Sequence, residues 1–125
     1  MIEQKIILIA EDEEPLLKAM VTKFSSEGFV VLQAHDGEKA LQIALKERPD
    51  IILLDILMPK MDGMTVCKKL REDNWGKDAP IIFLTNLNDV KRVTEATEEG
   101  VFDYLVKSDW HINDVVKKVK EKLKV

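Results

Sequence analysis

The chain has 125 residues, of which 46% are hydrophobic and 34% are charged, and its formal net charge is -4. This length suits one domain that buries roughly two-thirds of its unfolded surface. The negative charge gives no general attraction to nucleic acid, and no stretch approaches the ~20 consecutive apolar residues of a membrane span. The single cysteine, Cys67, occupies an apolar position of a helical pattern, which predicts a buried free thiol and a reducing, cytoplasmic location.

Short apolar runs alternate with helical patterns along the chain. Each run is too short for an ordinary helix and rich in β-formers, so each predicts a strand. The predicted strands cover residues 5–10, 29–32, 51–55, 80–84 and 101–106. A helical pattern follows each strand, and the fourth, carried by Val90, Val93 and Ala96, is the weakest. This alternation predicts an α/β fold in which a doubly wound, five-stranded parallel sheet has helices on both faces.

The last helix has an apolar stripe and a basic flank. Its lysines, most of which lie off the stripe, are Lys117, Lys118, Lys120, Lys122 and Lys124. This placement predicts a solvated face rather than a docking surface for an acidic partner. With the negative net charge, it also predicts no direct binding of nucleic acid.

Two of the predicted strands end in acidic residues. Asp55 follows the run IILL, and Glu11 and Asp12 follow the run IILIA. Parallel strands end at the same edge of a sheet, and the doubly wound strand order 2-1-3-4-5 makes the first and third strands neighbours about 5 Å apart. Carboxylates without a nearby histidine or second thiol suit Mg²⁺ better than Zn²⁺. The sequence therefore predicts that Glu11, Asp12 and Asp55 form a magnesium site, while Glu13 and Glu14 are solvated.

Thr85 and Lys107 follow the fourth and fifth apolar runs, so they reach the same edge. A carboxylate can hold a phosphoryl group as an aspartyl phosphate when a metal ion, a lysine and short donors neutralise the oxygens. Asp55, Thr85 and Lys107 supply the carboxylate, the hydroxyl donor and the cation for this chemistry.

Four blocks, ILIAED, ILLDILMPKMDG, IIFLT and DYLVK, occur in this order over essentially the whole chain. Their residues and spacing resemble the receiver domain of two-component response regulators. The resemblance implies a single receiver domain over residues 1–125, with a (βα)5 flavodoxin-like three-layer sandwich and strand order 2-1-3-4-5. It also implies a signalling domain that is not an enzyme, because it assists only its own phosphorylation and dephosphorylation.

The resemblance implies a role for each acid. Asp55 matches the aspartate that accepts a phosphoryl group from a sensor histidine kinase, a phosphotransfer protein or a small phosphodonor, in a reaction that depends on Mg²⁺. Asp12, Asp55 and the main-chain carbonyl of Leu57 match the direct metal ligands, and Glu11 matches an acid that acts through water.

The resemblance also implies a conformational switch. Thr85 matches the hydroxyl that moves to the phosphoryl oxygen, Tyr104 the aromatic residue that follows it, and Lys107 the cation that pairs with the new charge. The weak fourth helix is the expected moving part. Two positions depart from the family pattern: Ser108 replaces the usual proline, and Asn86 replaces a very small residue, which predicts slow loss of the phosphoryl group.

Three other readings compete with this one. A flavodoxin-like binding module is disfavoured because acids follow the first strand where a phosphate-binding loop would need glycines and hydroxyls. A phosphatase with an aspartyl nucleophile would need a second acid at the position of Leu57. A degenerate receiver that acts only as a scaffold stays open because of Ser108 and Asn86. The sequence leaves the cognate kinase and the effector unnamed, and a monomer or weak homodimer is expected.

Overall fold

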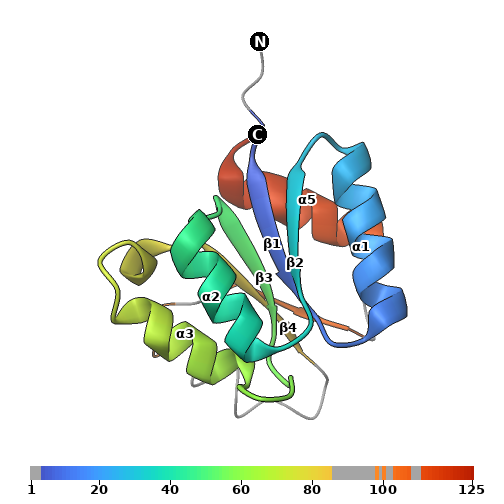
Figure 1. Cartoon of the computed structure of the whole chain (residues 1–125). Coiled ribbons are helices and arrows are strands. Elements are labelled where there is room, and N and C mark those ends of the chain that lie inside the picture. Colours follow the sequence, from blue (N-terminus) through green and yellow to red (C-terminus); the bar gives the residue numbers. More distant parts are fainter. Residues whose placement is uncertain (1–3, 86–97, 99, 101–102, 108–110) are drawn as a thin grey trace.

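The computed structural model describes residues 4–85, 98, 100, 103–107 and 111–125. Five parallel strands form one sheet in the order β2-β1-β3-β4-β5. The strands are β1 (Ile6–Ala10), β2 (Val30–Ala34), β3 (Ile51–Asp55), β4 (Ile81–Thr85) and β5 (Tyr104–Val106). Figure 1 shows the strands side by side with helices on either face. The doubly wound α/β fold and the strand order are therefore confirmed.

Four α-helices cover the sheet in the described part of the chain. They are α1 (Glu14–Ser26), α2 (Gly37–Glu47), α3 (Gly63–Arg71) and α5 (Ile112–Leu123), and a short 3-10 turn, η1 (Gly76–Asp78), follows α3. In Figure 1, α2 and α3 lie together on one face, whereas α1 and α5 lie on the other. The predicted fourth helix, with Val90, Val93 and Ala96, lies outside the described residues.

The central strands explain why an unbroken apolar run predicts a buried strand. All five residues of β3 are buried, and the register pairs Leu53 with Ile9 on one side and with Ile82 on the other. Because successive side chains point to opposite faces, Leu53 belongs to the core beneath α1 and α5, while Leu54 belongs to the core beneath α2 and α3. The sheet therefore has no solvated face at its centre.

The second strand begins later than the apolar pattern suggests. Phe29 was expected to open it, but β2 begins at Val30 and runs to Ala34. The N–H of Phe29 donates to the carbonyl of Phe24, and Gly28 has a φ of +93°, so both residues belong to the turn that ends α1. The two phenylalanine rings pack edge to face, with centroids 5.3 Å apart. The helix end therefore takes Phe29 out of the strand.

Three lysines on the basic flank of α5 form ion pairs with neighbouring elements of the fold. Lys118 and Lys122 contact Asp103, just before β5, at 3.6 and 2.5 Å. Lys120 contacts Glu27, at the end of α1, at 2.6 Å. The face that the sequence predicts to be solvated is therefore only partly solvated at these three lysines, because the carboxylates that they reach belong to elements packed against α5.

Smaller predictions can also be compared with the structure. Cys67 is a buried thiol that is in no disulfide, as expected. Trp75 packs against the core beneath α2 and α3. Within the part of the chain that is described, none of the helices combines the length and the apolar composition that a membrane crossing requires.

Candidate metal-binding site

Two neighbouring strands bring three acids to one edge of the sheet. Glu11 directly follows β1 and Asp55 is the last residue of β3, and these strands pair with Ala10 opposite Leu54. Carboxylate oxygens of Glu11, Asp12 and Asp55 lie within 4.8 Å of one another. Glu11 is fully buried and Asp55 is 3% exposed, whereas Asp12 is exposed. The three predicted acids therefore form one cluster that opens to solvent at Asp12.

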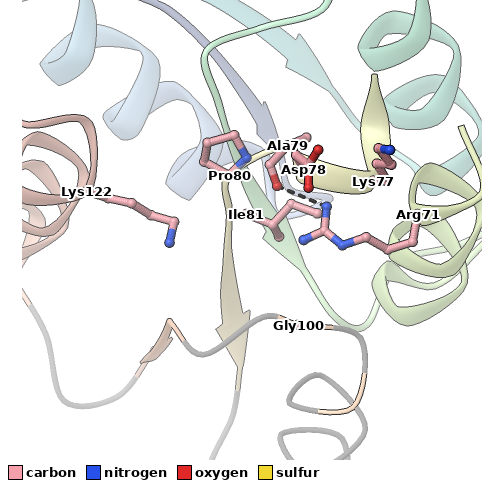
Figure 2. Close-up of a pocket in the computed structure, with 8 residues that line it drawn as sticks. All are labelled: Arg71, Lys77, Asp78, Ala79, Pro80, Ile81, Gly100 and Lys122. Carbon is pink, nitrogen blue, oxygen red and sulfur yellow. Dashed lines mark hydrogen bonds between the residues drawn. The ribbon is translucent and has the colours of Figure 1, made fainter. Parts of the chain in front are cut away.

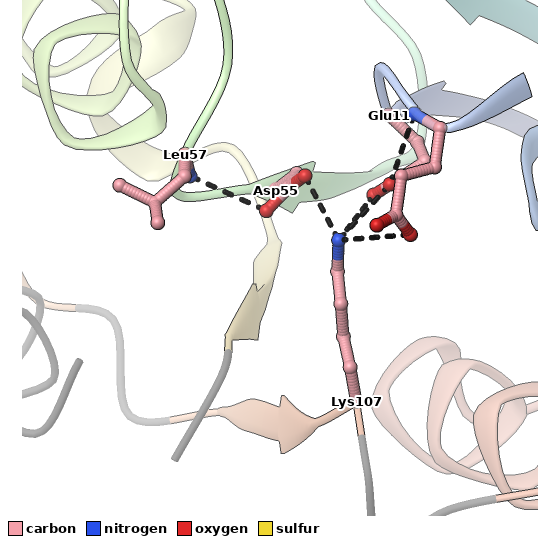
Figure 3. Close-up of polar contacts among 5 residues, drawn as sticks. Glu11, Asp55, Leu57 and Lys107 are labelled. Atoms are coloured by element: carbon pink, nitrogen blue, oxygen red, sulfur yellow. Dashed lines mark hydrogen bonds and ion pairs between the residues drawn. The ribbon is translucent and has the colours of Figure 1, made fainter. Parts of the chain in front are cut away.

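Lys107 links the two buried acids. Its Nζ donates to Oε1 of Glu11 at 3.0 Å and to Oδ2 of Asp55 at 2.9 Å (Figure 3). The backbone N–H of Lys107 donates to the carbonyl of Thr85 at 2.7 Å, which places the start of this side chain beside the end of β4. The side chain is only 13% exposed. Three strand ends thus assemble a lysine between two carboxylates.

Burial and like charge perturb the pKa values in this cluster. Burial first, and then the charge of Glu11, raise the pKa of Asp55 to about 8, although Lys107 opposes this shift. Burial acts to lower the pKa of Lys107, but its hydrogen bonds to Glu11 and Asp55 outweigh burial and raise it. Lys107 is therefore charged at neutral pH, whereas Asp55 mostly holds a proton.

The donor set fits a hard divalent cation. Oε2 of Glu11 is buried and lies 2.9 Å from Nζ of Lys107 as an ion pair, and it has no hydrogen-bond partner among the described residues. A buried oxygen of this kind, together with the neighbouring acids, is suited to a metal or to a metal-bound water. Leu57, two residues after Asp55, is 45% exposed, and its N–H donates to Oδ1 of Asp55 at 3.3 Å. The loop that carries the fourth predicted ligand therefore begins against the carboxylate of Asp55.

The structure brings Thr85 to the same edge but leaves Tyr104 on the surface. Thr85 is the last residue of β4 and is 2% exposed. The carbonyl of Leu84, the residue before Thr85, accepts a hydrogen bond from the N–H of Ile56 at 3.1 Å. Tyr104, on the edge strand β5, is 45% exposed. Asn86 and Ser108 lie outside the described residues, so the expectations attached to them stay predictions.

Sequence reasoning did not anticipate the contacts that Glu13 makes at this edge. Glu13, expected to be solvated, is 63% exposed, yet its Oε2 lies 3.9 Å from Nζ of Lys107, and its N–H donates to Oε1 of Glu11 at 3.2 Å. An acid two residues beyond a strand end could have been considered as a neighbour of the cluster, but no spacing rule shows which way the chain turns there.

A separate pocket of about 430 Å³ lies at the other end of the strands, near the start of β4 (Figure 2). Among the described residues that line it, two of the three cations, Arg71 and Lys122, have partners within the fold. Arg71 donates to the carbonyls of Gly76 and Ala79 at 2.7 and 3.0 Å, and Lys122 contacts Asp103. These bonds fix η1 and the chain before β4, so the pocket has a structural explanation.

The sequence matches a known family and longer relatives. The family model for the response regulator receiver domain matches residues 7–120. The chain is 45% identical over 101 residues to the probable transcriptional regulator ycf27 of Guillardia theta, covering 81% of this chain and 39% of that protein. It is 38% identical over 110 residues to the response regulator PleD of Caulobacter vibrioides, covering 88% and 24%. The chain thus spans well under half the length of these curated relatives.

Solved structures share the fold over nearly the whole chain. A putative response regulator from Chloroflexus aurantiacus has a TM-score of 0.88 and 32% identity, covering 98% of this chain and 100% of that one. The chemotaxis response regulator CheY4 of Vibrio cholerae has a TM-score of 0.87 and 27% identity, covering 95% and 98%. The receiver domain of the sensor histidine kinase PA1611 of Pseudomonas aeruginosa, with a magnesium ion in its active-site cleft, has a TM-score of 0.81 and 27% identity, covering 95% and 97%.

Proposed function

The chain belongs to the response regulator receiver family, and from this membership we propose that it is a phosphorylation-switched signalling domain whose phosphoacceptor is Asp55. A sensor histidine kinase or a phosphotransfer protein is the proposed donor. The observation that carries the proposal is the buried Asp55 carboxylate at a strand end, hydrogen-bonded to Lys107 and within 4.8 Å of two further acids. We propose that residues 1–125 act as one such domain.

The proposed reaction is a transfer to a carboxylate oxygen. One oxygen of Asp55 attacks the phosphorus atom of a phosphohistidine, the phosphorus–nitrogen bond breaks, and its electron pair stays on the imidazole nitrogen. Asp55 must be ionised to attack, and its raised pKa opposes ionisation. Asp12, Asp55 and the Leu57 carbonyl would hold Mg²⁺, and Glu11 would act through water; the bound ion would supply positive charge that lowers this pKa and neutralises the phosphoryl oxygens. The magnesium ion in the PA1611 receiver supports this choice of metal.

The proposed switch begins with the charge of the phosphoryl group. It adds about 1.5 to 2 negative charges beside Lys107, whose ammonium group now bridges Glu11 and Asp55. Lys107 then pairs with the phosphoryl group, and the Thr85 hydroxyl donates to one of its oxygens. Tyr104, which is 45% exposed on the neighbouring strand, follows Thr85 inward. A two-state change of this kind suits a signalling domain that is not an enzyme in its own right.

The proposed partners follow from the family and its relatives. A histidine kinase supplies the phosphoryl group, and the output depends on a partner that senses the switch. The relatives named as transcriptional regulators are longer than this chain, so an effect on transcription is a proposal for a protein that includes such a region. Direct binding of nucleic acid by residues 1–125 is not expected, and a monomer or weak homodimer stays the expected state.

Incubation with Mg²⁺ and acetyl phosphate, followed by intact-mass measurement, tests the proposal. The parent chain should gain the mass of one phosphoryl group, and Asp55→Asn should gain none because an amide oxygen does not form the acyl phosphate. Asp78→Asn is the matched control, since Asp78 is exposed at the other end of the strands, and it should gain the same mass as the parent. Equal phosphorylation of the parent and Asp55→Asn would show that Asp55 is not the acceptor.

A further inference from the structure

Two Asp-Gly pairs begin two different helices beside the same loop. Asp36 and Asp62 are the N-caps of α2 and α3 and accept hydrogen bonds from Lys39 and Thr65 N–H groups, each at 2.8 Å. Gly37 and Gly63 are the first residues of these helices, and both are buried. Residues 56–62, called here the 56–62 loop, connect β3 to the start of α3. The same loop also contacts the start of α2.

Both glycines are required by space and not by an unusual φ. A Cβ atom on Gly37 would lie 1.7 Å from the carbonyl oxygen of Met61, and a Cβ atom on Gly63 would lie 2.2 Å from the carbonyl oxygen of Asp55. Both obstacles are backbone atoms, which cannot rotate away as the end of a side chain can. The absence of Cβ atoms therefore lets α2 and α3 approach the 56–62 loop from its two ends.

Hydrogen bonds hold the loop in this position. The N–H of Gly37 donates to the carbonyl of Pro59 at 3.3 Å, and the N–H of Gly63 donates to the carbonyl of Ile56 at 2.7 Å. Lys60 has a φ of +68°, rare for a residue with a side chain. Its Nζ lies 3.7 Å from Oδ2 of Asp36, but the Lys60 side chain is 62% exposed, so this ion pair adds little to the hold on the loop. The backbone path of the loop is thus fixed from α2 as well as from α3.

We propose that Gly37 is a positioning residue for the metal site, because the close approach of α2 sets the path of the loop that carries the Leu57 carbonyl. This inference rests on the proposed function. Gly37 is the first residue of α2, whereas none of the proposed ligands lies in a helix, and it contacts the loop at Met61 and Pro59. An alanine there must push the Met61 carbonyl from 1.7 Å to beyond 3.0 Å. A loop displaced by more than 1 Å cannot keep the Leu57 carbonyl and the Asp55 carboxylate directed at one cation.

Titration of Mg²⁺ into metal-free protein by calorimetry tests the proposal without any phosphoryl donor. Gly37→Ala should weaken Mg²⁺ binding by about tenfold or more, since the loop ligand is lost while the acids remain. The matched control is Gly28→Ala. Gly28 has a φ of +93° and no heavy atom within 4 Å of its Cβ position, and it lies at the end of the strands remote from the site. This control should lower the unfolding midpoint by backbone strain and leave the Mg²⁺ affinity at the parent value.

A second pair of variants keeps the test decisive if Gly37→Ala does not fold. Proline at position 60 holds φ near about -65°, which is incompatible with the observed +68°, whereas glycine accepts that value. The Lys60 side chain is 62% exposed, and both variants lose its contact with Asp36. Lys60→Pro should therefore weaken Mg²⁺ binding several-fold, and Lys60→Gly should bind as the parent does.

Each outcome bears on a distinct claim. Parent-like Mg²⁺ affinity in Gly37→Ala, or in Lys60→Pro if Gly37→Ala does not fold, would overturn the positioning role and leave the proposed function intact. A parent chain that binds no Mg²⁺ and gains no phosphoryl mass would overturn both. A weakened affinity confined to Gly37→Ala and Lys60→Pro, with Gly28→Ala and Lys60→Gly unchanged, supports the role that we assign to Gly37.

Discussion

The ammonium group of Lys107 holds two buried carboxylates that would otherwise repel each other. It lies within 3.0 Å of Glu11 and Asp55, and all three side chains are largely withdrawn from water. One proton on Asp55 and one cation on Lys107 therefore balance two acids. A divalent ion in the same cluster must compete with both, and this competition can be measured.

The affinity for Mg²⁺ should depend on pH through Asp55. Its pKa is raised to about 8, so below that pH the folded protein mostly holds a proton that the metal must displace. The affinity should rise by up to about tenfold for each pH unit between about 6 and 8 and level off above this range. Calorimetric titrations at several pH values measure the slope. Asp55→Asn should bind more weakly with a much smaller slope, and a flat profile in the parent would contradict the raised pKa.

Replacing the lysine should destabilise the metal-free protein. Lys107→Met leaves Glu11 and Asp55 without their shared cation, at an expected cost of about 2 to 4 kcal/mol in the free energy of unfolding. Saturating Mg²⁺ should recover part of this loss, because the metal supplies the missing positive charge. Urea unfolding with and without Mg²⁺ measures both effects. Lys77→Met, an exposed lysine on η1, should change neither quantity, and an equal Mg²⁺ response in both variants would argue against the bridging role.

At the scale of elements, α5 is joined by charge to both of its neighbours. Lys118 and Lys122 contact Asp103 beside β5, and Lys120 contacts Glu27 at the end of α1. A hydrogen bond from Lys122 is the main cause of the lowered pKa of Asp103. Since β5 carries Tyr104 and leads directly into Lys107, these ion pairs connect the last helix to the strand that is proposed to respond to phosphorylation.

The ion pairs at Asp103 should contribute little to stability and should be sensitive to salt. Asp103→Asn removes both lysine contacts from a carboxylate whose side chain is 30% exposed, so the expected loss is at most about 1 kcal/mol. Urea unfolding at low salt and in about 1 M NaCl tests this, because salt screens exposed charges and should shrink the difference from the parent. Glu121→Gln, an exposed acid on α5, is the control. A loss of several kcal/mol that persists in salt would contradict this estimate.

Which features the sequence predicts depends on how local their cause is. The strand ends at Asp55 and Thr85 could be predicted because an apolar run shows where a buried strand stops. The simultaneous contact of Lys107 with Glu11 and Asp55 could not be predicted, because it depends on the path that the long lysine side chain takes toward the ends of β1 and β3. The approach of Gly37 to Met61 was also missed, since composition does not reveal which glycine faces a distant carbonyl. The lysine pairs of α5 were missed for the same reason.

For the molecule as a whole, one sheet separates two apolar cores. One core lies beneath α2 and α3 and the other beneath α1 and α5, and the strands contribute alternate residues to each. Successive side chains of β3 therefore pack into different cores, so substitutions at neighbouring positions test opposite halves of the molecule. Because both cores share strands β1 to β4, neither half is expected to unfold without the other.

Truncations on the two faces of β3 should be equally severe. Leu53→Ala and Leu54→Ala each remove a fully buried side chain, and each should lower the free energy of unfolding by about 2 to 5 kcal/mol. Urea unfolding followed by both circular dichroism and tryptophan fluorescence should give a single, coincident transition for each variant. Leu45→Ala, a leucine 39% exposed on α2, should cost much less. Separate transitions in either core variant would show that the halves are independent.

The bond between Lys107 and Glu11 joins residues 96 positions apart, and it has a consequence for a chain during synthesis. A nascent polypeptide that has reached residue 100 already contains every carboxylate of the cluster but lacks the lysine that completes it. Such an unfinished molecule lacks the cation that the proposed chemistry needs to stabilise an acyl phosphate. Under the proposed function, the capacity to be phosphorylated therefore arises only when translation has supplied Lys107, directly after β5.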